Sequence, residues 1–236
     1  MDTGPADPVQ PPPVPLRTVF HEELDQLKLQ VELMGVRVDQ NLERMRQVLD
    51  HGDPHGVIVR SALAADDEID AMHVSLLERC YGILGREAPV AGDLRYLVSI
   101  VRLLSELERI GDLALRVVKL APDVQELSSC GPAWDIVRTL VEVAVDEYRT
   151  ALRAWSTQDL ALATRLVEEP PRLGAFHERL IDELRRLDGA DVVAVAMHLF
   201  VAAQAADRIA DHAAVIGARL RYLMTGDPGH LVAEVR

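Results

Sequence analysis

The sequence predicts an all-α protein built as two pseudo-symmetric antiparallel three-helix bundles, with six main helices in total. Three observations support this fold class: the composition, the spacing of the apolar residues and an internal duplication. Hydrophobic residues make up 49% of the 236 residues but aromatic residues only 4%. Leucine, valine and alanine dominate, and such a composition suits helix-on-helix packing better than the β-branched, aromatic core of a sheet.

Apolar residues recur at steps of three and four along the first predicted helix, from Arg17 to about Leu49. They mark one helical stripe, whose members are Leu24, Leu27, Val31, Met34, Val38, Leu42, Met45 and Leu49. Residues 1–16, before this helix, are rich in proline, which can neither sustain a helix nor bury much apolar surface. We therefore expect a disordered tail there.

Two further helices are predicted in the first half. One runs from Val57 to Leu84, after an Asp53-Pro54 pair that is typical of a helix start. The next runs from Pro89 to Leu120. Because short connections make consecutive helices antiparallel, residues 17–121 are expected to form the first three-helix bundle.

The same plan repeats after a loop that carries serine, glycine and proline. Helices are predicted from Trp134 to about Trp155, from Thr157 to Leu187 with a break at Pro170-Pro171, and from Asp191 to Met224. Residues 132–226 would thus form the second bundle, and residues 227–236 a C-terminal tail.

A seven-residue motif occurs once in each half. The segment Glu108-Arg109-Ile110-Gly111-Asp112-Leu113-Ala114 of the third predicted helix matches Asp207-Arg208-Ile209-Ala210-Asp211-His212-Ala213 of the sixth. The match indicates that the halves are duplicated three-helix units. A related echo is the pair His73 and His177, in the second and fifth predicted helices.

The repeated motif places two carboxylates one helical turn apart on the same helix face. Three pairs with this spacing occur in or beside the repeated motif's helices, and they are Asp66 with Asp70, Glu108 with Asp112, and Asp207 with Asp211. Like charges at this spacing repel, so we expect an arginine or a cation to compensate them. Carboxylates on two adjacent helices form an oxygen-rich site suited to hard divalent cations or iron, which makes these six residues candidate metal ligands.

A simpler interpretation of the same acids is a solvated face with intrahelical ion pairs. Asp112 would then pair with Arg116, and Arg208 with Asp211. The metal site is favoured because the motif occurs twice at equivalent places, and because small residues on the same stripes let a neighbouring helix approach.

Two histidines lie near these acids in the sequence. His73 follows Asp70 by three residues and His212 follows Asp211 directly, so both are weaker ligand candidates. No Glu-x-x-His occurs, which argues against a di-iron carboxylate oxidase of the ferritin-like kind.

Composition and motifs also argue against several classes of function. The net charge of -13 repels polyanions, so nucleic acid is not an expected partner. The most apolar run, from Val192 to Ala206, is too short to cross a bilayer, and the N-terminus has no secretory pattern, so we expect a cytoplasmic protein without direct membrane insertion. Standard nucleophile and nucleotide-binding signatures are absent, and the chain is not predicted to be an enzyme.

Four segments resemble the signatures of the PhoU family. Two segments resemble the first-half signature, and they are Pro89-Val90-Ala91-Gly92-Asp93-Leu94-Arg95 and Leu107-Glu108-Arg109-Ile110-Gly111-Asp112. Two others resemble the second-half signature, and they are Asp207-Arg208-Ile209-Ala210-Asp211-His212 and Tyr222-Leu223-Met224-Thr225-Gly226. The resemblance covers roughly Leu16 to His230. It implies a usually dimeric pair of three-helix bundles that binds metal clusters through Glu/Asp-x-x-x-Asp pairs.

The resemblance also implies a regulatory role. Members of this family link the phosphate-specific ABC transporter to its sensor kinase, and restrain phosphate uptake and phosphate-starvation signalling. We therefore expect the cytoplasmic subunits of the transporter and the phosphate sensor kinase as partners, a homodimer, and a peripheral position at the inner face of the membrane through these partners. The alternatives are a metal-free helical scaffold and, ranked last, a metal-dependent hydrolase or oxidase.

The second half departs from the family pattern. The positions of the fifth helix that match the acidic pair of the second helix are Pro170 and Gly174, and only Glu168 and Glu169 lie nearby. Affinity for a hard cation grows with the number of well-placed carboxylates. The first site is therefore expected to fill at a lower metal concentration than the second.

Overall fold

The computed structural model describes residues 16–171 and 173–235, and within them every regular element is helical. The predicted tail of residues 1–16 lies outside the described residues, apart from Leu16. The long helices are α1 (Leu16–His51), α2 (Val57–Glu87), α3 (Ala91–Val118), α5 (Pro132–Thr157) and α8 (Val192–Thr225). The short ones are α4 (Val124–Ser128), α6 (Leu160–Glu168), α7 (Gly174–Leu184) and the 3₁₀ segments η1 (Ala121–Asp123) and η2 (Pro228–Val235). The all-α prediction is confirmed.

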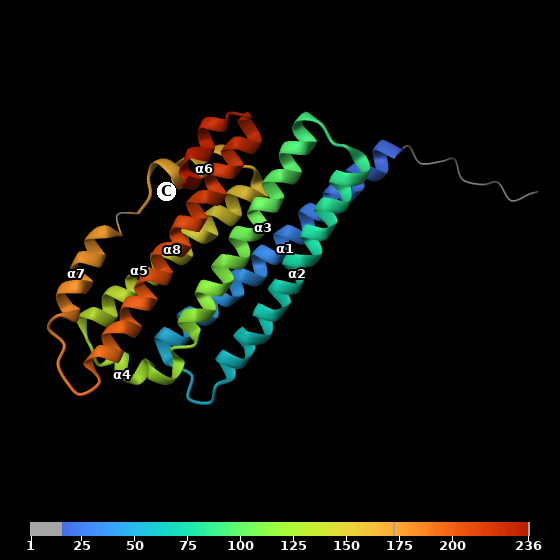
Figure 1. The fold of residues 1–236 in the computed structure, drawn as a ribbon. Helices are drawn as coiled ribbons and strands as arrows, with labels where there is room; N and C mark the ends of the chain where they lie inside the picture. Colours follow the sequence, from blue (N-terminus) through green and yellow to red (C-terminus); the bar gives the residue numbers. More distant parts are fainter. Residues whose placement is uncertain (1–15, 172, 236) are drawn as a thin grey trace, which may run out of the picture.

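The helices form an elongated bundle in which the two halves lie side by side (Figure 1). In the first half α1, α2 and α3 pack on one another, and in the second half α8 packs on α5 and α6. The halves meet where α3 packs on α8 and α1 on α5. The buried apolar residues therefore form one hydrophobic core that runs through both halves.

The start of α2 is fixed by Asp53, as its position before a proline predicts. One carboxylate oxygen of Asp53 accepts a hydrogen bond from the Val57 amide at 2.9 Å, and the other accepts one from Val59 at 2.8 Å. These bonds satisfy amides that have no partner inside the helix. The register of α2, and with it the position of its acidic pair, is thereby set.

Three boundaries differ from the sequence prediction. α2 continues to Glu87, so Gly82 and Gly85 lie inside the helix and do not mark its end. The connection after α3, expected as a loop, contains η1 and α4. The expected C-terminal tail contains η2, which packs on α8. The break at Pro170-Pro171 is confirmed, because α6 ends at Glu168 and α7 begins at Gly174.

α8 is, by length and composition, apolar enough to cross a membrane, and it is longer than the apolar run predicted from the sequence. It is also the helix that contacts α3, α5 and α6 together. Its core positions are mostly small or aliphatic, including Leu199, Ala203, Ile209 and Ala213, all with no exposed surface. Core packing therefore accounts for part of its apolar composition.

Candidate metal centre

The acids of the first half share one surface between α2 and α3. Asp66 and Asp70 lie on α2, and Glu108 and Asp112 on the neighbouring α3. A Cβ built on Gly111 would stand 3.6 Å from Ile69 Cδ1 and 3.9 Å from Asp66 Oδ1, which are ordinary contact distances. The Asp66 carboxylate therefore lies beside the turn of α3 that carries Glu108 and Asp112.

The acids of this group interact electrostatically. Burial, then the charges of Asp70 and Asp112, raise the pKa of Asp66 to about 6, against a smaller lowering by Lys119. The pKa of Glu108 is raised by burial and then by Asp112, while nearby His73 lowers it. The charges of acids on both helices thus act on the half-buried Asp66 and Glu108. A proton or a cation between these carboxylates is therefore favoured.

No ion pair within the described residues compensates these carboxylates, although Lys119 acts on Asp66 from a distance. Among the described residues, none of the four first-half acids forms a salt bridge or a side-chain hydrogen bond. The intrahelical pairs that the simpler interpretation requires, Asp112 with Arg116 and Arg208 with Asp211, are not formed in the described part of the chain. The acids are therefore left without the ion pairs of an ordinary solvated face.

The acids of the second half lie on α8, where the duplication predicts them. The pKa of Asp211 is raised by burial and then by Asp207, with opposing contributions from His212 and Arg208. His177 of α7 faces this pair, with Nε2 3.5 Å from Asp207 Oδ1. The matching helix is broken, so carboxylates from a second helix do not join the pair.

Glu168 does not reach the second group of acids. It forms a salt bridge of 2.9 Å with Arg221, far beyond Asp211 along α8. Glu169, the other glutamate near the break, is exposed. The difference in carboxylate number between the halves, which the sequence predicted, is therefore present in the structure.

The His212 side chain contacts Glu106 of α3 and not the adjacent Asp211. Its Nδ1 lies 2.6 Å from Glu106 Oε2 of α3, and both side chains are almost completely buried. Neighbouring residues on a helix point about 100° apart, so adjacency in the sequence did not indicate a shared site. The pair instead links α3 to α8, and the sequence analysis did not anticipate Glu106.

Two histidine ring nitrogens near these acids lack a hydrogen-bond partner. His73 Nε2 and His177 Nε2 are both buried, and neither makes a hydrogen bond. His73 lies on α2 near Glu108, and His177 lies on α7 near Asp207. The only sequence feature that pointed to His177 was its correspondence with His73 in the other half.

The donors do not converge on one point as the side chains stand. In residues 16–171 and 173–235, no group of three or more His, Cys, Asp or Glu residues is placed to hold an ion. The exposed acids Asp70, Asp112 and Asp211 lie at helix surfaces and are free to change rotamer. Binding a cation would therefore require these carboxylates to turn inward, against a repulsion that the cation itself removes.

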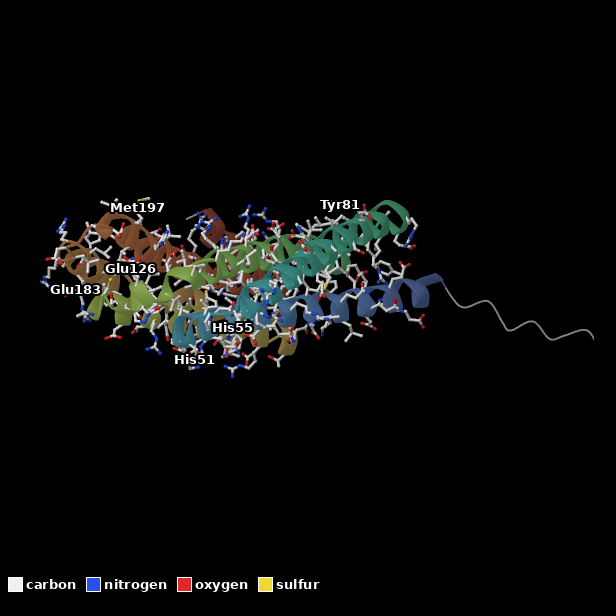
Figure 2. All side chains as sticks on the ribbon, turned by 90° about the horizontal axis from the view of Figure 1, so that it is seen from below. His51, His55, Tyr81, Glu126, Glu183 and Met197 are labelled. Atoms are coloured by element: carbon white, nitrogen blue, oxygen red, sulfur yellow. The ribbon has the colours of Figure 1, made fainter. Side chains whose placement is uncertain are left out.

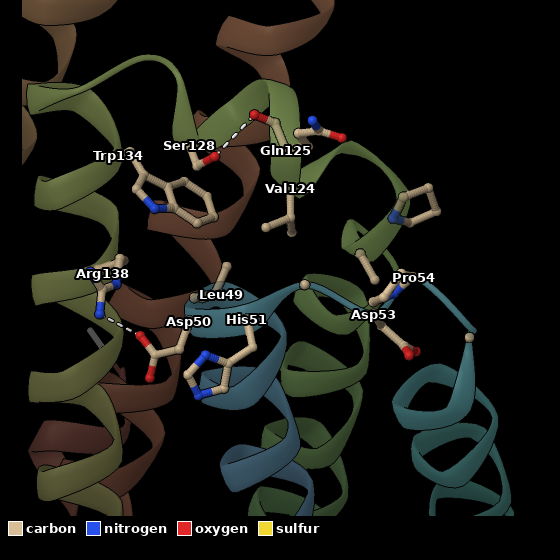
Figure 3. Close-up of a pocket in the computed structure, with 14 residues that line it drawn as sticks. Leu49, Asp50, His51, Asp53, Pro54, Val124, Gln125, Ser128, Trp134 and Arg138 are labelled. Atoms are coloured by element: carbon tan, nitrogen blue, oxygen red, sulfur yellow. Dashed lines mark hydrogen bonds and ion pairs between the residues drawn. The ribbon is translucent and has the colours of Figure 1, made fainter.

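A cavity lies at a different place in the molecule. It has a volume of about 720 Å³ and lies between the α1–α2 connection, η1, α4 and the start of α5 (Figure 3). Arg138 and Asp50 form an ion pair at its wall, and Trp134 and Val124 supply apolar surface. None of the predicted metal ligands lines this cavity.

The chain is similar to known proteins in sequence and in fold. The family model described as PhoU domain matches residues 31–121, which include both acidic pairs of the first half. The phosphate-specific transport system accessory protein PhoU homolog 2 of Mycobacterium tuberculosis is 26% identical over 212 residues, covering 89% of this chain and 99% of that protein. The crystal structure of PhoU from Pseudomonas aeruginosa superposes with a TM-score of 0.80 at 26% identity, over 88% of this chain and 100% of that one. Residues 31–121 therefore form a PhoU domain, and the chain is similar to PhoU proteins over most of its length.

The similarity to PhoU proteins extends over both halves. The family model ends at residue 121, but the relatives align beyond it. The PhoU protein of Edwardsiella tarda, for example, is 27% identical over 211 residues, which are 88% of this chain and 85% of that protein. The second-half motif around Asp207 and Asp211 thus lies in the part of the chain that is similar to PhoU proteins.

Proposed function

We propose that this chain is a metal-binding regulatory accessory protein of the phosphate-specific ABC transporter and its sensor kinase. In this role it restrains phosphate uptake and the phosphate-starvation response. The observation that carries the proposal is the pair of uncompensated acid groups at equivalent places on duplicated helices. The names of the relatives, accessory proteins of phosphate-specific transport systems, support the transporter as the partner.

The residues present would hold a cation once the exposed carboxylates turn inward. Asp66, Asp70, Glu108 and Asp112 would hold it across α2 and α3, and Asp207 and Asp211 would hold a second one on α8. A bound divalent or iron-type ion supplies positive charge that offsets the repulsion within each group. The half-buried Asp66 and Glu108 would set the position of the site, while the exposed acids complete it from the surface.

Contact with partner proteins is supported by exposed apolar side chains on the helices that carry the acids. Leu94 and Val98 of α3 are 41% and 40% exposed, and Val193 and Met197 at the matching positions of α8 are 69% and 61% exposed. Figure 2 shows Met197 on the same side of the molecule as Tyr81 of α2, which is 59% exposed.

These partners define the proposed assembly. Cytoplasmic parts of the transporter and the kinase would hold the protein at the inner face of the membrane, as a homodimer. Co-purification from the native host tests this: the intact chain is expected to retain transporter or kinase subunits, and Asp66→Asn with Asp112→Asn is expected to retain less. Asp146→Asn on α5, an exposed acid without an ion pair, is the matched control. An intact chain that retains neither subunit would refute the proposal.

A metal-free helical scaffold is the second candidate function. It is favoured by the absence of three converging donors in the described part of the chain. Elemental analysis of protein purified without chelator separates the two, because a scaffold would contain no stoichiometric metal while retaining the same partners.

A further inference from the structure

We propose that the side of the molecule formed by α3 and α8 binds a twofold-symmetric protein partner, in which two copies of one cytoplasmic transporter subunit make equivalent contacts with the two halves. The inference rests on the proposed function for the existence of that partner, and adds its symmetry and the surface that it contacts. The docking face consists of Leu94, Val98 and Arg109 of α3, and of Val193, Met197 and Arg208 of α8.

The first observation is that exposed apolar side chains repeat with the internal duplication. The motif of α3 recurs in α8 at an offset of 99 residues, since Glu108 corresponds to Asp207. At the same offset Val98 corresponds to Met197, and these two side chains are 40% and 61% exposed. Both halves thus present apolar surface at equivalent positions, which a partner with two copies of one element can contact twice.

The second observation is that α3 and α8 run antiparallel (Figure 1), and that the contact of Glu106 with His212 sets their register. Val98 lies eight residues from Glu106, and Met197 lies 15 residues from His212 on the other side of this contact. At a rise of about 1.5 Å per residue, the two apolar positions are about 35 Å apart along the bundle. Met197 is on the same side of the molecule as Tyr81 of α2, the helix that packs beside α3 (Figure 2).

The third observation is a matched pair of arginines between the two apolar positions. Arg109 and Arg208 are both exposed, and each follows the apolar residue of its own half by 11 residues, from Val98 and from Met197. Eleven residues are about three helical turns, so each arginine lies on the same face as its apolar residue. In the register of α3 and α8 the two arginines lie nearly level. Each acts on the charge of an acid of its own helix, but neither forms an ion pair or a hydrogen bond within the described residues.

The other contact between the halves, where α1 packs on α5, differs in this respect. Arg46 of α1 forms an ion pair of 2.8 Å with Glu142 of α5, and Arg149 of α5 forms one of 2.7 Å with Asp39 of α1. These arginines hold the two halves together and are not available to a partner. The arginines of the docking face have no such role, so their charge is available for recognition.

Charge complementarity then specifies the partner. The two apolar positions require an apolar group from each partner subunit, and the arginines between them require carboxylates near the partner's own twofold axis. A twofold axis relates identical surfaces of two subunits, so both requirements are met by one surface used twice. Once one subunit is bound, contact with the second is intramolecular and adds affinity without a new kind of contact.

The test measures binding of the full chain to the detergent-solubilised phosphate transporter of the native host, with its cytoplasmic subunits present. Val98→Asp and Met197→Asp are each expected to weaken binding by at least about tenfold, because either change leaves a one-sided complex. Arg109→Glu combined with Arg208→Glu is expected to weaken binding most strongly at low salt. Leu29→Asp is the matched control, at a residue of α1 that is 65% exposed.

Photo-crosslinking tests the symmetry directly. A crosslinker placed at Val98 and, in a second sample, at Met197 is expected to react with the same segment of the transporter subunit. Crosslinks to two different segments, or weaker binding in only one of the two aspartate variants, would overturn the inference. Loss of self-association in either variant, measured by sedimentation, would overturn it as well, because a second copy of the chain would then cover the face.

The same measurements separate this inference from the proposed function. If the intact chain binds the transporter and neither aspartate variant weakens binding, the inference is overturned while the proposed function stands. Retention of the kinase without the transporter would overturn the inference in the same way. If the intact chain retains neither transporter nor kinase subunits, the proposed function itself fails.

Discussion

The guanidinium of Arg95 lies against the backbone of Gly226. A Cβ added to Gly226 would stand 2.9 Å from Arg95 Nη1 and 3.3 Å from Cζ. Gly226 caps the C-terminus of α8 with a φ of 74°, and Arg95 belongs to the first turns of α3. The negative end of the α8 dipole thus meets a cation from the other half of the chain.

Gly226→Ala is therefore expected to destabilise the protein. The left-handed conformation costs a residue with a side chain about 1–2 kcal/mol, and the new methyl group would also displace Arg95. Gly85→Ala is the control, since Gly85 is helical with open space around it, and alanine should stabilise α2 there by about 0.5–1 kcal/mol. Urea unfolding of both variants measures the effect, and equal shifts of the midpoint would contradict it.

The link between Glu106 and His212 should contribute to stability across the two halves. His212→Ala leaves the buried Glu106 carboxylate without its partner, which is expected to cost about 1–3 kcal/mol of unfolding free energy. Glu106→Leu combined with His212→Leu should cost less than the sum of the single changes, because no charge is left unpaired. Additive single effects in this cycle would show that the two groups do not interact.

The stability of the metal-free protein should depend on pH through Asp66. Its pKa is raised from 3.8 to about 6 in the folded state, so the folded protein holds a proton that the unfolded chain has released. The destabilisation of the folded state by the Asp66 charge is absent below pH 3.8, grows as the pH rises and is complete above about pH 6.

Asp66→Asn should remove this dependence. In chelator-treated protein at pH 7.5 it is expected to stabilise by about 1 kcal/mol, less than the full pKa shift implies because solvent screens the partly exposed group. At pH 4 the difference from the natural chain should nearly vanish. A variant that is equally stabilised at both pH values would show that charge is not the cause.

Metal loss should be unequal between the two halves. Asp112→Ala is expected to remove more bound metal than Asp211→Ala, because four carboxylates surround the first position and two the second. Both residues are exposed, so the substitutions are matched for burial. Calorimetric titration of the two variants gives the measurement, and a larger loss from Asp211→Ala would mean that carboxylate number does not set occupancy.

The helices could be predicted from sequence because burial follows periodicity. Every member of the stripe from Leu24 to Leu49 is buried. The end of α2 was misplaced because an isolated glycine on an exposed face costs only about 1 kcal/mol, which packing of Ile83 in the core outweighs.

The acids were predictable from spacing, but their surroundings were not. The Gly111 contact follows from a small residue in a helical stripe. The salt bridge from Glu168 to Arg221 depends on the direction of the chain after Pro170-Pro171, which no local pattern specifies. The orientation of His212 towards Glu106 likewise depends on how α8 packs against α3.

The break between α6 and α7 makes the two halves of this duplicated molecule different. Without it, a rotation about the pseudo-twofold axis would present nearly the same charges to a binding surface. With it, one half carries four acids supported by a continuous α2, and the other half carries two acids facing a short α7. A partner that contacts both halves therefore meets two distinguishable groups of acids, and a dimer of such chains has four groups of two kinds.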